Sequence, residues 1–127
     1  MRRILIVEDS PTMRALVTVA LEGISTAVKI TEAVSGFEAL RVLHCERFDL
    51  IVTDINMPDI NGLELVSFVK NSEPHRSIPL VIISTESSQR DRAKGLGLGA
   101  DAYLVKPFEP EALRQIAEDL LADSPEE

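Results

Sequence analysis

A chain of 127 residues with 45% hydrophobic and 27% charged residues has the length and composition of one globular domain. Its 21 acidic and 13 basic residues give a formal net charge of −8, which argues against a nucleic-acid-binding surface. The single cysteine, Cys45, excludes an internal disulfide, and no apolar run is long enough to span a membrane. We therefore expect a cytoplasmic protein with no membrane insertion.

Residues 4–7 form a continuous apolar run, which predicts a buried strand, and the acidic pair Glu8-Asp9 ends it. Ser10-Pro11 then supplies an N-cap and a first helical residue, and apolar residues recur at helical spacing up to residue 21. A looser alternation over residues 28–33 predicts a strand nearer the edge of the sheet. The first helix is expected to face the core with Met13, Leu16, Val17, Ala20 and Leu21, and the helix that begins at Ser35-Gly36 with Phe37, Leu40 and Leu43.

Residues 50–52 are another short apolar run, which ends at Asp54 and predicts a third buried strand. After a loop, Asn61 with Glu64 resembles a capping box for a third helix. Residues 80–83 and 102–105 predict the fourth and fifth strands, which are followed by Ser84 and Lys106.

The helix between the last two strands is expected over residues 88–99, with Ala93 and Leu96 in its helical pattern. Gly95 and Gly97 each cost about 1 kcal/mol relative to alanine in a helix interior, so this helix should be the least stable of the five. Pro110 opens the last helix, and residues 123–127 form an acidic tail that we expect to be frayed.

Strand and helix thus alternate five times, which predicts an α/β fold with a doubly wound, five-stranded parallel sheet and helices on both faces. A doubly wound sheet of this kind takes the strand order 2-1-3-4-5, so the first and third strands are neighbours. We expect one domain over residues 1–122, followed by the tail over residues 123–127.

Polar residues stand at four predicted strand ends, and parallel strands end at the same edge of a sheet. Glu8, Asp9 and Asp54 should therefore meet in one pocket with Ser84 and Lys106. Clustered carboxylates repel one another, and Mg²⁺, which prefers oxygen ligands, would relieve that repulsion. Lys106 offers a positive charge and Ser84 a hydroxyl to phosphoryl oxygens. We interpret Asp54 as a covalent phosphate acceptor.

Taken together and in this order, these motifs resemble the receiver domain of response regulators. The chain is similar over residues 3–121 to the CheY-like, single-domain chemotaxis regulators, which have the flavodoxin-like fold. The residues that carry the resemblance are Glu8-Asp9, the stretch Asp-Ile-Asn-Met-Pro-Asp-Ile-Asn-Gly over residues 54–62, Ser84, Tyr103 and Lys106-Pro107-Phe108.

The resemblance implies that Asp54 takes a phosphoryl group from the phosphohistidine of a histidine kinase or phosphotransfer domain. It also implies a Mg²⁺ ion held by Asp9, Asp54 and the backbone carbonyl of Asn56, with Glu8 acting through water. Lys106 would contact the phosphoryl group.

The same resemblance implies a switch in which Ser84 turns toward the phosphoryl group and Tyr103 moves inward. The bond before Pro107 is expected to be cis, and the side chains of Asn56 and Glu86 are expected to tune self-dephosphorylation. Ser84 stands where threonine is commoner in the family and Glu8 where aspartate is, and both exchanges keep the functional group.

We therefore expect a stand-alone response regulator of a chemotaxis-type phosphorelay, which is not a turnover enzyme. It would act on a downstream effector protein through the face formed by the fourth helix, the fifth strand and the fifth helix. A monomer is expected, with dimerisation through that face as the alternative.

Three other functions share parts of this pattern. A pseudo-receiver would serve as an interaction module without being phosphorylated. A haloacid-dehalogenase-like phosphatase would need a second aspartate as general acid where Asn56 stands. A flavin carrier would need a hydroxyl- and glycine-rich loop after the first strand and aromatic walls, yet only 4% of the residues are aromatic.

Overall fold

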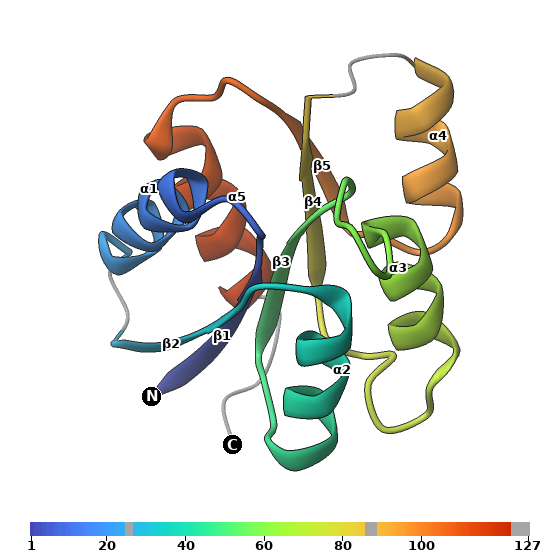
Figure 1. Cartoon of the computed structure of the whole chain (residues 1–127). Helices are drawn as coiled ribbons and strands as arrows, with labels where there is room; N and C mark the ends of the chain where they lie inside the picture. Colours follow the sequence, from blue (N-terminus) through green and yellow to red (C-terminus); the bar gives the residue numbers. More distant parts are fainter. Residues whose placement is uncertain (25–26, 86–88, 123–127) are drawn as a thin grey trace.

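The computed structural model describes residues 1–24, 27–85 and 89–122, in which strands and helices alternate five times (Figure 1). The acidic tail and residue 88 lie outside the described residues. The strands are β1 (Arg2–Val7), β2 (Val28–Ala33), β3 (Leu50–Asp54), β4 (Leu80–Ser84) and β5 (Ala102–Val105). The helices are α1 (Pro11–Glu22), α2 (Gly36–Cys45), α3 (Gly62–Asn71), α4 (Gln89–Gly97) and α5 (Pro110–Ala122).

The sheet has the strand order β2-β1-β3-β4-β5 with every pair parallel, which confirms the predicted doubly wound fold. The inner strands are apolar runs because helices cover both of their faces. β2, at the end of the order, has the partly exposed residues expected of an edge strand. The register sets Val7 beside Thr53 and Asp54 beside Ile83, so β1, β3 and β4 finish at one edge.

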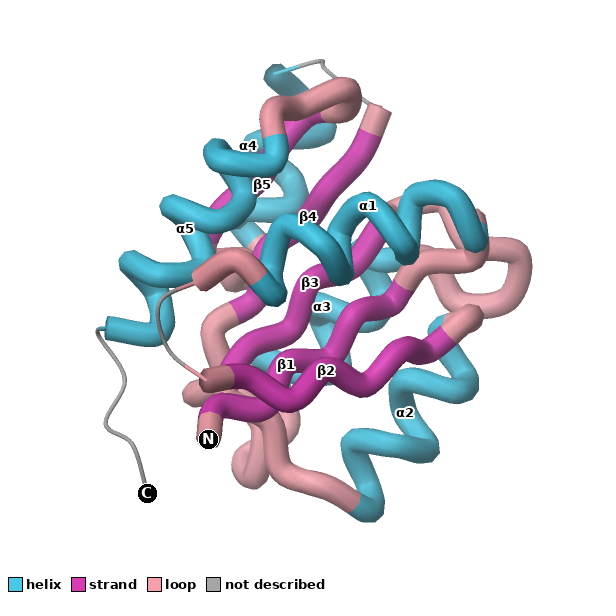
Figure 2. Tube along the Cα trace, turned by 90° about the vertical axis from the view of Figure 1, so that its left-hand side faces the viewer, coloured by secondary structure: helices cyan, strands magenta, loops and turns pink. Residues whose placement is uncertain are grey.

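Helices form a layer on each side of the sheet. In Figure 1, α1 and α5 cover one face and α2, α3 and α4 cover the other, and Figure 2 looks onto the face with α1 and α5. Successive strand residues point to opposite faces, so Ile51 packs in one apolar core with Leu65 and Val52 in the other with Leu113. None of the described helices is both long and apolar enough to cross a lipid bilayer.

Two residues that the sequence predicts for the core lie on the surface. Leu16 of α1 and Phe37 of α2 are 42% and 64% exposed, so the prediction that they face inward is wrong. α2 buries the predicted Leu43, and it buries Ala39 and Val42 in place of Phe37, because its first turn meets the loop before α3 through Gly36. Which residues of a helix are buried depends on how the helix is rotated about its own axis, and the apolar periodicity alone does not fix that rotation.

The α4 helix turns a glycine toward the sheet. Ala93 and Leu96, which carry the helical pattern in the sequence, are exposed. Among the nine residues of α4, all of which the structure describes, Gly95 is the buried one. A β-carbon at Gly95 would lie 2.8 Å from Cδ1 of Ile82 and 3.5 Å from Cδ2 of Tyr103. The absence of a side chain thus lets α4 approach β4 and β5 closely.

The end of β3 is fixed by a close approach of the chain to itself. Asn61 and Glu64 form the predicted capping box of α3. Gly62, the first residue of the helix, donates from its N–H to the carbonyl of Ile55 at 2.8 Å. A β-carbon on Gly62 would lie 2.1 Å from the carbonyl oxygen of Asp54. A glycine is therefore required for α3 to begin directly against the backbone that carries Asp54.

Gly62→Ala is expected to lower the free energy of unfolding by at least about 2 kcal/mol, because the new methyl group meets backbone that cannot move aside. The matched control is Gly97→Ala at the end of α4, where a β-carbon would meet nothing within 4 Å. That change should leave stability unchanged or raise it by up to about 1 kcal/mol. Urea unfolding of both variants checks the prediction, and equal effects would contradict it.

Candidate functional site

Three ionisable side chains project from the carboxyl edge of the sheet in one row. Glu8 follows β1, Asp54 ends β3 and Lys106 follows β5. Side chains two positions apart on a strand point to the same face of the sheet. Ile6 lies two residues before Glu8, and Val52 two before Asp54, and both pack in the core beneath α1 and α5. The topology therefore brings together residues that are up to 98 positions apart in the sequence.

The Lys106 ammonium joins two buried carboxylates. Its Nζ donates to Oε1 of Glu8 at 3.0 Å and lies 3.5 Å from Oδ1 of Asp54. The side chains of Glu8, Asp54 and Lys106 are only 1%, 8% and 11% exposed. Asp9 is exposed beside them, and one carboxylate oxygen each of Glu8, Asp9 and Asp54 lies within 4.8 Å of the others. The predicted carboxylate–lysine cluster is therefore present and opens to solvent at Asp9.

Negative charge is in excess in this cluster. Burial raises the pKa of Glu8 above its ordinary value, and the nearby negative charge of Asp54 raises it further. Hydrogen bonds from the Ser10 N–H and the Lys106 ammonium lower that pKa and offset part of the effect. The three carboxylates, two of which contact the Lys106 ammonium, form an all-oxygen donor set suited to a hard divalent cation such as Mg²⁺.

Arg14 of α1 holds the backbone of the acidic pair. Its Nη1 donates to the carbonyl oxygens of Glu8 at 3.0 Å and Asp9 at 3.3 Å, and its Nε donates to Oε1 of Glu32 at 3.1 Å. Thr18 donates to the other carboxylate oxygen of Glu32 at 3.3 Å. Arg14 could not be predicted from the sequence, because an arginine in an amphipathic helix has no local feature that distinguishes it from a solvated surface residue.

Further hydrogen bonds orient Asp54 at the end of β3. The N–H of Ile55 donates to Oδ1 of Asp54 at 2.8 Å, and Oγ1 of Thr53 donates to the Asp54 carbonyl at 2.9 Å. Asn56, whose carbonyl is implied as a metal ligand, is exposed in the loop that follows. Oδ1 of Asp54 is thus held both by the N–H of the next residue and by the Lys106 ammonium.

Ser84 and Tyr103 lie on the other side of the sheet from the row of Glu8 and Asp54. Ser84 is fully buried at the end of β4, and the register places it two residues beyond the partner of Tyr103. The Tyr103 ring is already inside, at 4% exposure, in the core beneath α2 and α3. The Lys106–Pro107 bond is cis, as the resemblance implies, and Glu86 lies outside the described residues.

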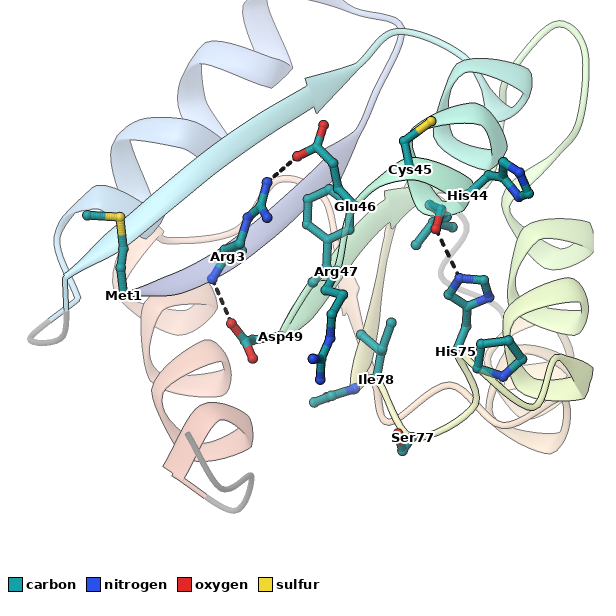
Figure 3. Close-up of a pocket in the computed structure, with 14 residues that line it drawn as sticks. Met1, Arg3, His44, Cys45, Glu46, Arg47, Asp49, His75, Ser77 and Ile78 are labelled. Atoms are coloured by element: carbon teal, nitrogen blue, oxygen red, sulfur yellow. Dashed lines mark hydrogen bonds and ion pairs between the residues drawn. The ribbon is translucent and has the colours of Figure 1, made fainter. Parts of the chain in front are cut away.

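A wide hollow of about 830 Å³ lies at the opposite end of the strands (Figure 3). There the Arg3 N–H donates to Oδ2 of Asp49 at 2.8 Å, and the Arg3 guanidinium pairs with Glu46. Its lining comes from the start of the chain and of β1, the end of α2 and the loops before β3 and β4, and no residue of the carboxylate–lysine cluster contributes. The hollow is therefore separate from the candidate site.

Comparison with known proteins decides the family. The family model of the response regulator receiver domain matches residues 4–118. The chain belongs to the response regulator receiver domain family. Its receiver sequence is 35% identical to the chemotaxis protein CheY homolog of Campylobacter jejuni over 120 residues, covering 94% of this chain and 92% of that protein. It is 34% identical to chemotaxis protein CheY1 of Helicobacter pylori, with 94% and 96% covered.

The solved structure of the chemotaxis response regulator CheY4 of Vibrio cholerae has the same receiver fold. The two chains superpose with a TM-score of 0.85 at 33% identity, covering 94% of this chain and 98% of that one. The chain is thus a CheY-like receiver, as the motifs indicated, and not a haloacid-dehalogenase-like phosphatase. Receiver domains bind Mg²⁺ in general, and they interact with histidine kinases and effectors.

Glu8→Gln is expected to raise the melting temperature at pH 7 by a few degrees in the absence of divalent cations. Because burial raises the pKa of Glu8 in the folded state, the folded chain binds that proton more tightly, and the ionised carboxylate opposes folding. The gain should disappear as the pH falls below the ordinary value of 4.5, where Glu8 is protonated in both states.

Thermal unfolding from pH 4 to pH 8 measures this gain. Glu111→Gln, at an exposed glutamate of α5, is the control and should leave the profile close to that of the native chain. A Glu8→Gln protein that melts below the native chain at pH 7 would contradict the electrostatic account.

Proposed function

We propose that this chain is a response regulator of a chemotaxis-type phosphorelay, in which Asp54 accepts a phosphoryl group from a histidine kinase or phosphotransfer domain. The observation that supports the proposal is the cluster of Asp54 with Glu8, Asp9 and Lys106 at the carboxyl edge of the sheet. The bond formed joins a carboxylate oxygen of Asp54 to phosphorus, and the bond broken joins phosphorus to the donor's imidazole nitrogen. Similarity to chemotaxis proteins supports the pathway.

The proposed metal ligands are the carboxylates of Asp9 and Asp54 and the backbone carbonyl of Asn56, with Glu8 acting through water. Mg²⁺ bound there would neutralise the phosphoryl oxygens during transfer. Phosphoryl transfer depends on positioning and charge compensation more than on covalent help from the protein. The edge of the sheet would position Asp54, and the oxygen ligands beside it would hold the cation that compensates the charge.

Lys106 is proposed to bind an oxygen of the transferred phosphoryl group. Its Nζ is 3.5 Å from Oδ1 of Asp54, so a group added to that carboxylate would come within reach of the ammonium. Glu8 holds the ammonium at 3.0 Å before transfer, and a metal ion near Glu8 would weaken that pair. The lysine would thus pass from one negative partner to another without leaving the pocket.

Ser84 and Tyr103 are proposed to carry the signal to the surface formed by α4, β5 and α5. They lie on the sheet face covered by α4, and Gly95 packs that helix against the Tyr103 ring. The Ser84 hydroxyl would donate to the phosphoryl group, and the tyrosine would repack in response. A downstream effector protein would bind the altered surface, and Asn56 and Glu86 would tune how long the phosphoryl group persists.

We propose a single receiver domain over residues 1–122 with an acidic tail over residues 123–127, located in the cytoplasm. The protein would act as a monomer, or as a dimer through the α4-β5-α5 surface on activation. Asp54 would also lose its phosphoryl group to water without another protein, which is self-catalysis and not turnover of an external substrate.

Incubation with acetyl phosphate and Mg²⁺ is expected to add one phosphoryl group to the native chain and none to Asp54→Asn. Intact-mass spectrometry measures the adduct, and prior chelation of Mg²⁺ should abolish it. Asp119→Asn, at an exposed aspartate of α5, is the matched control and should be modified like the native chain.

Absence of an adduct from every phosphodonor would overturn the proposed acceptor and favour a pseudo-receiver that acts unmodified. An adduct that persists in Asp54→Asn would place the acceptor elsewhere in the chain.

Beryllofluoride with Mg²⁺, a mimic of the bound phosphoryl group, is expected to shift the amide resonances of α4, β5 and α5. The reason is that Tyr103 of β5 packs beneath Gly95 of α4, and Ser84 faces the same side of the sheet, so their movement must repack α4. Two-dimensional NMR of the native chain, with Asp54→Asn as control, measures the change. Shifts confined to the residues around Asp54 would contradict a switch through this surface.

A further inference from the structure

Asp59, in the loop between β3 and α3, binds the first turn of a different helix. Its Oδ1 accepts from the N–H of Gly36 at 3.1 Å and its Oδ2 from the N–H of Phe37 at 2.9 Å. These N–H groups begin α2 and have no partner within that helix. The hydrogen bond from Phe37 is the largest cause of a pKa of Asp59 below its ordinary value, so the charged form makes the contact.

Packing accompanies these hydrogen bonds. A β-carbon on Gly36 would lie 2.6 Å from Cβ of Ile60 and 2.8 Å from its carbonyl oxygen. The residue after Asp59 therefore rests directly on the backbone of α2. The helix has its own N-cap as well, since Oγ of Ser35 accepts from the N–H of Glu38 at 3.2 Å. Asp59 is thus a second cap that comes from the loop beside the site.

The loop that Asp59 ties down is the one that carries Asn56. At its base, the N–H of Gly62 donates to the carbonyl of Ile55 at 2.8 Å and closes the loop. The segment of residues 56–60 above that base is called the arch here. Asn56, Pro58 and Asp59 are exposed in it, Met57 packs partly buried against the core, and Asp59 anchors the arch to α2. The backbone that carries the Asn56 carbonyl is therefore held at the base of the loop, at Met57 by the core, and at the far end by Asp59.

We propose that Asp59 is a positioning residue of the metal site, which holds the Asn56 carbonyl toward the carboxylate–lysine cluster by fastening the loop to α2. This inference rests on the proposed function, because Asn56 is a metal ligand only within that proposal. Without Asp59, the arch would sample other conformations, and Mg²⁺ would have to order it on binding. The cost would appear as weaker Mg²⁺ affinity in a chain that is still folded.

The experiment compares Mg²⁺ dissociation constants, measured by calorimetry, for the native chain, Asp59→Ala, Asp59→Asn and Ser35→Ala. Asp59→Ala is expected to weaken Mg²⁺ binding about tenfold, the lower end of the effect of outer residues on metal affinity. Asp59→Asn keeps one acceptor oxygen and should fall between Asp59→Ala and the native chain. Ser35→Ala removes the other cap of α2, so it should lower the melting temperature without changing Mg²⁺ affinity.

A second measurement does not depend on the metal. In the metal-free protein, the amide resonances of Gly36 and Phe37 should move in both Asp59 variants, and those of the arch from residue 56 to 60 should broaden. Ser35→Ala should leave the arch unchanged. If Asp59→Ala fails to fold, Asp59→Asn provides both measurements.

Unchanged Mg²⁺ affinity in Asp59→Asn and Asp59→Ala, when the native chain binds Mg²⁺, would overturn this inference and leave the proposed function intact. Equal loss of affinity in Ser35→Ala would overturn it as well, because α2 stability alone would then be responsible. A native chain that does not bind Mg²⁺ would overturn the inference together with the proposed metal site.

Discussion

The ammonium of Lys106, set between the carboxylates of Glu8 and Asp54, is the interaction on which the edge of the sheet depends. It ties the end of β5 to the ends of β1 and β3. Charges removed from water this far are costly unless they are paired, and one ammonium cannot compensate three carboxylates. This shortage of positive charge destabilises the cluster. It would therefore favour binding of a divalent cation, and it would let Lys106 change its carboxylate partner.

The supports around the cluster act on the backbone rather than on the charged groups themselves. Arg14 binds the carbonyls of the acidic pair, and Gly62 lets α3 start against the carbonyl of Asp54. Asp59 fastens the next loop to α2. Each support comes from a different element, so the site is positioned by the packing of helices on both faces of the sheet. Rigid placement of ligands by outer contacts is what a metal site requires.

The fold and the meeting of the cluster residues followed from the sequence, because buried parallel strands read as apolar runs whose ends share one edge. The helix faces were harder to predict. Phe37 is exposed where the periodicity placed it inside, and α4 buries Gly95, because the partner surface decides the rotation of each helix. Arg14 and Asp59 escaped prediction since their partners lie on other elements, and a contact between distant segments leaves no local pattern.

We expect the carboxylate cluster to bind a divalent cation that relieves the repulsion among its carboxylates. The melting temperature of the native chain and of Asp9→Asn, measured against Mg²⁺ concentration, tests it most directly, because Asp9 is exposed and can be replaced without disturbing the core. Mg²⁺ should stabilise the native chain by about 2.7 kcal/mol at a hundred times its dissociation constant. Asp9→Asn should lose most of that gain at the same concentration. Equal stabilisation of both proteins, or none of the native chain, would contradict a cation site at these carboxylates.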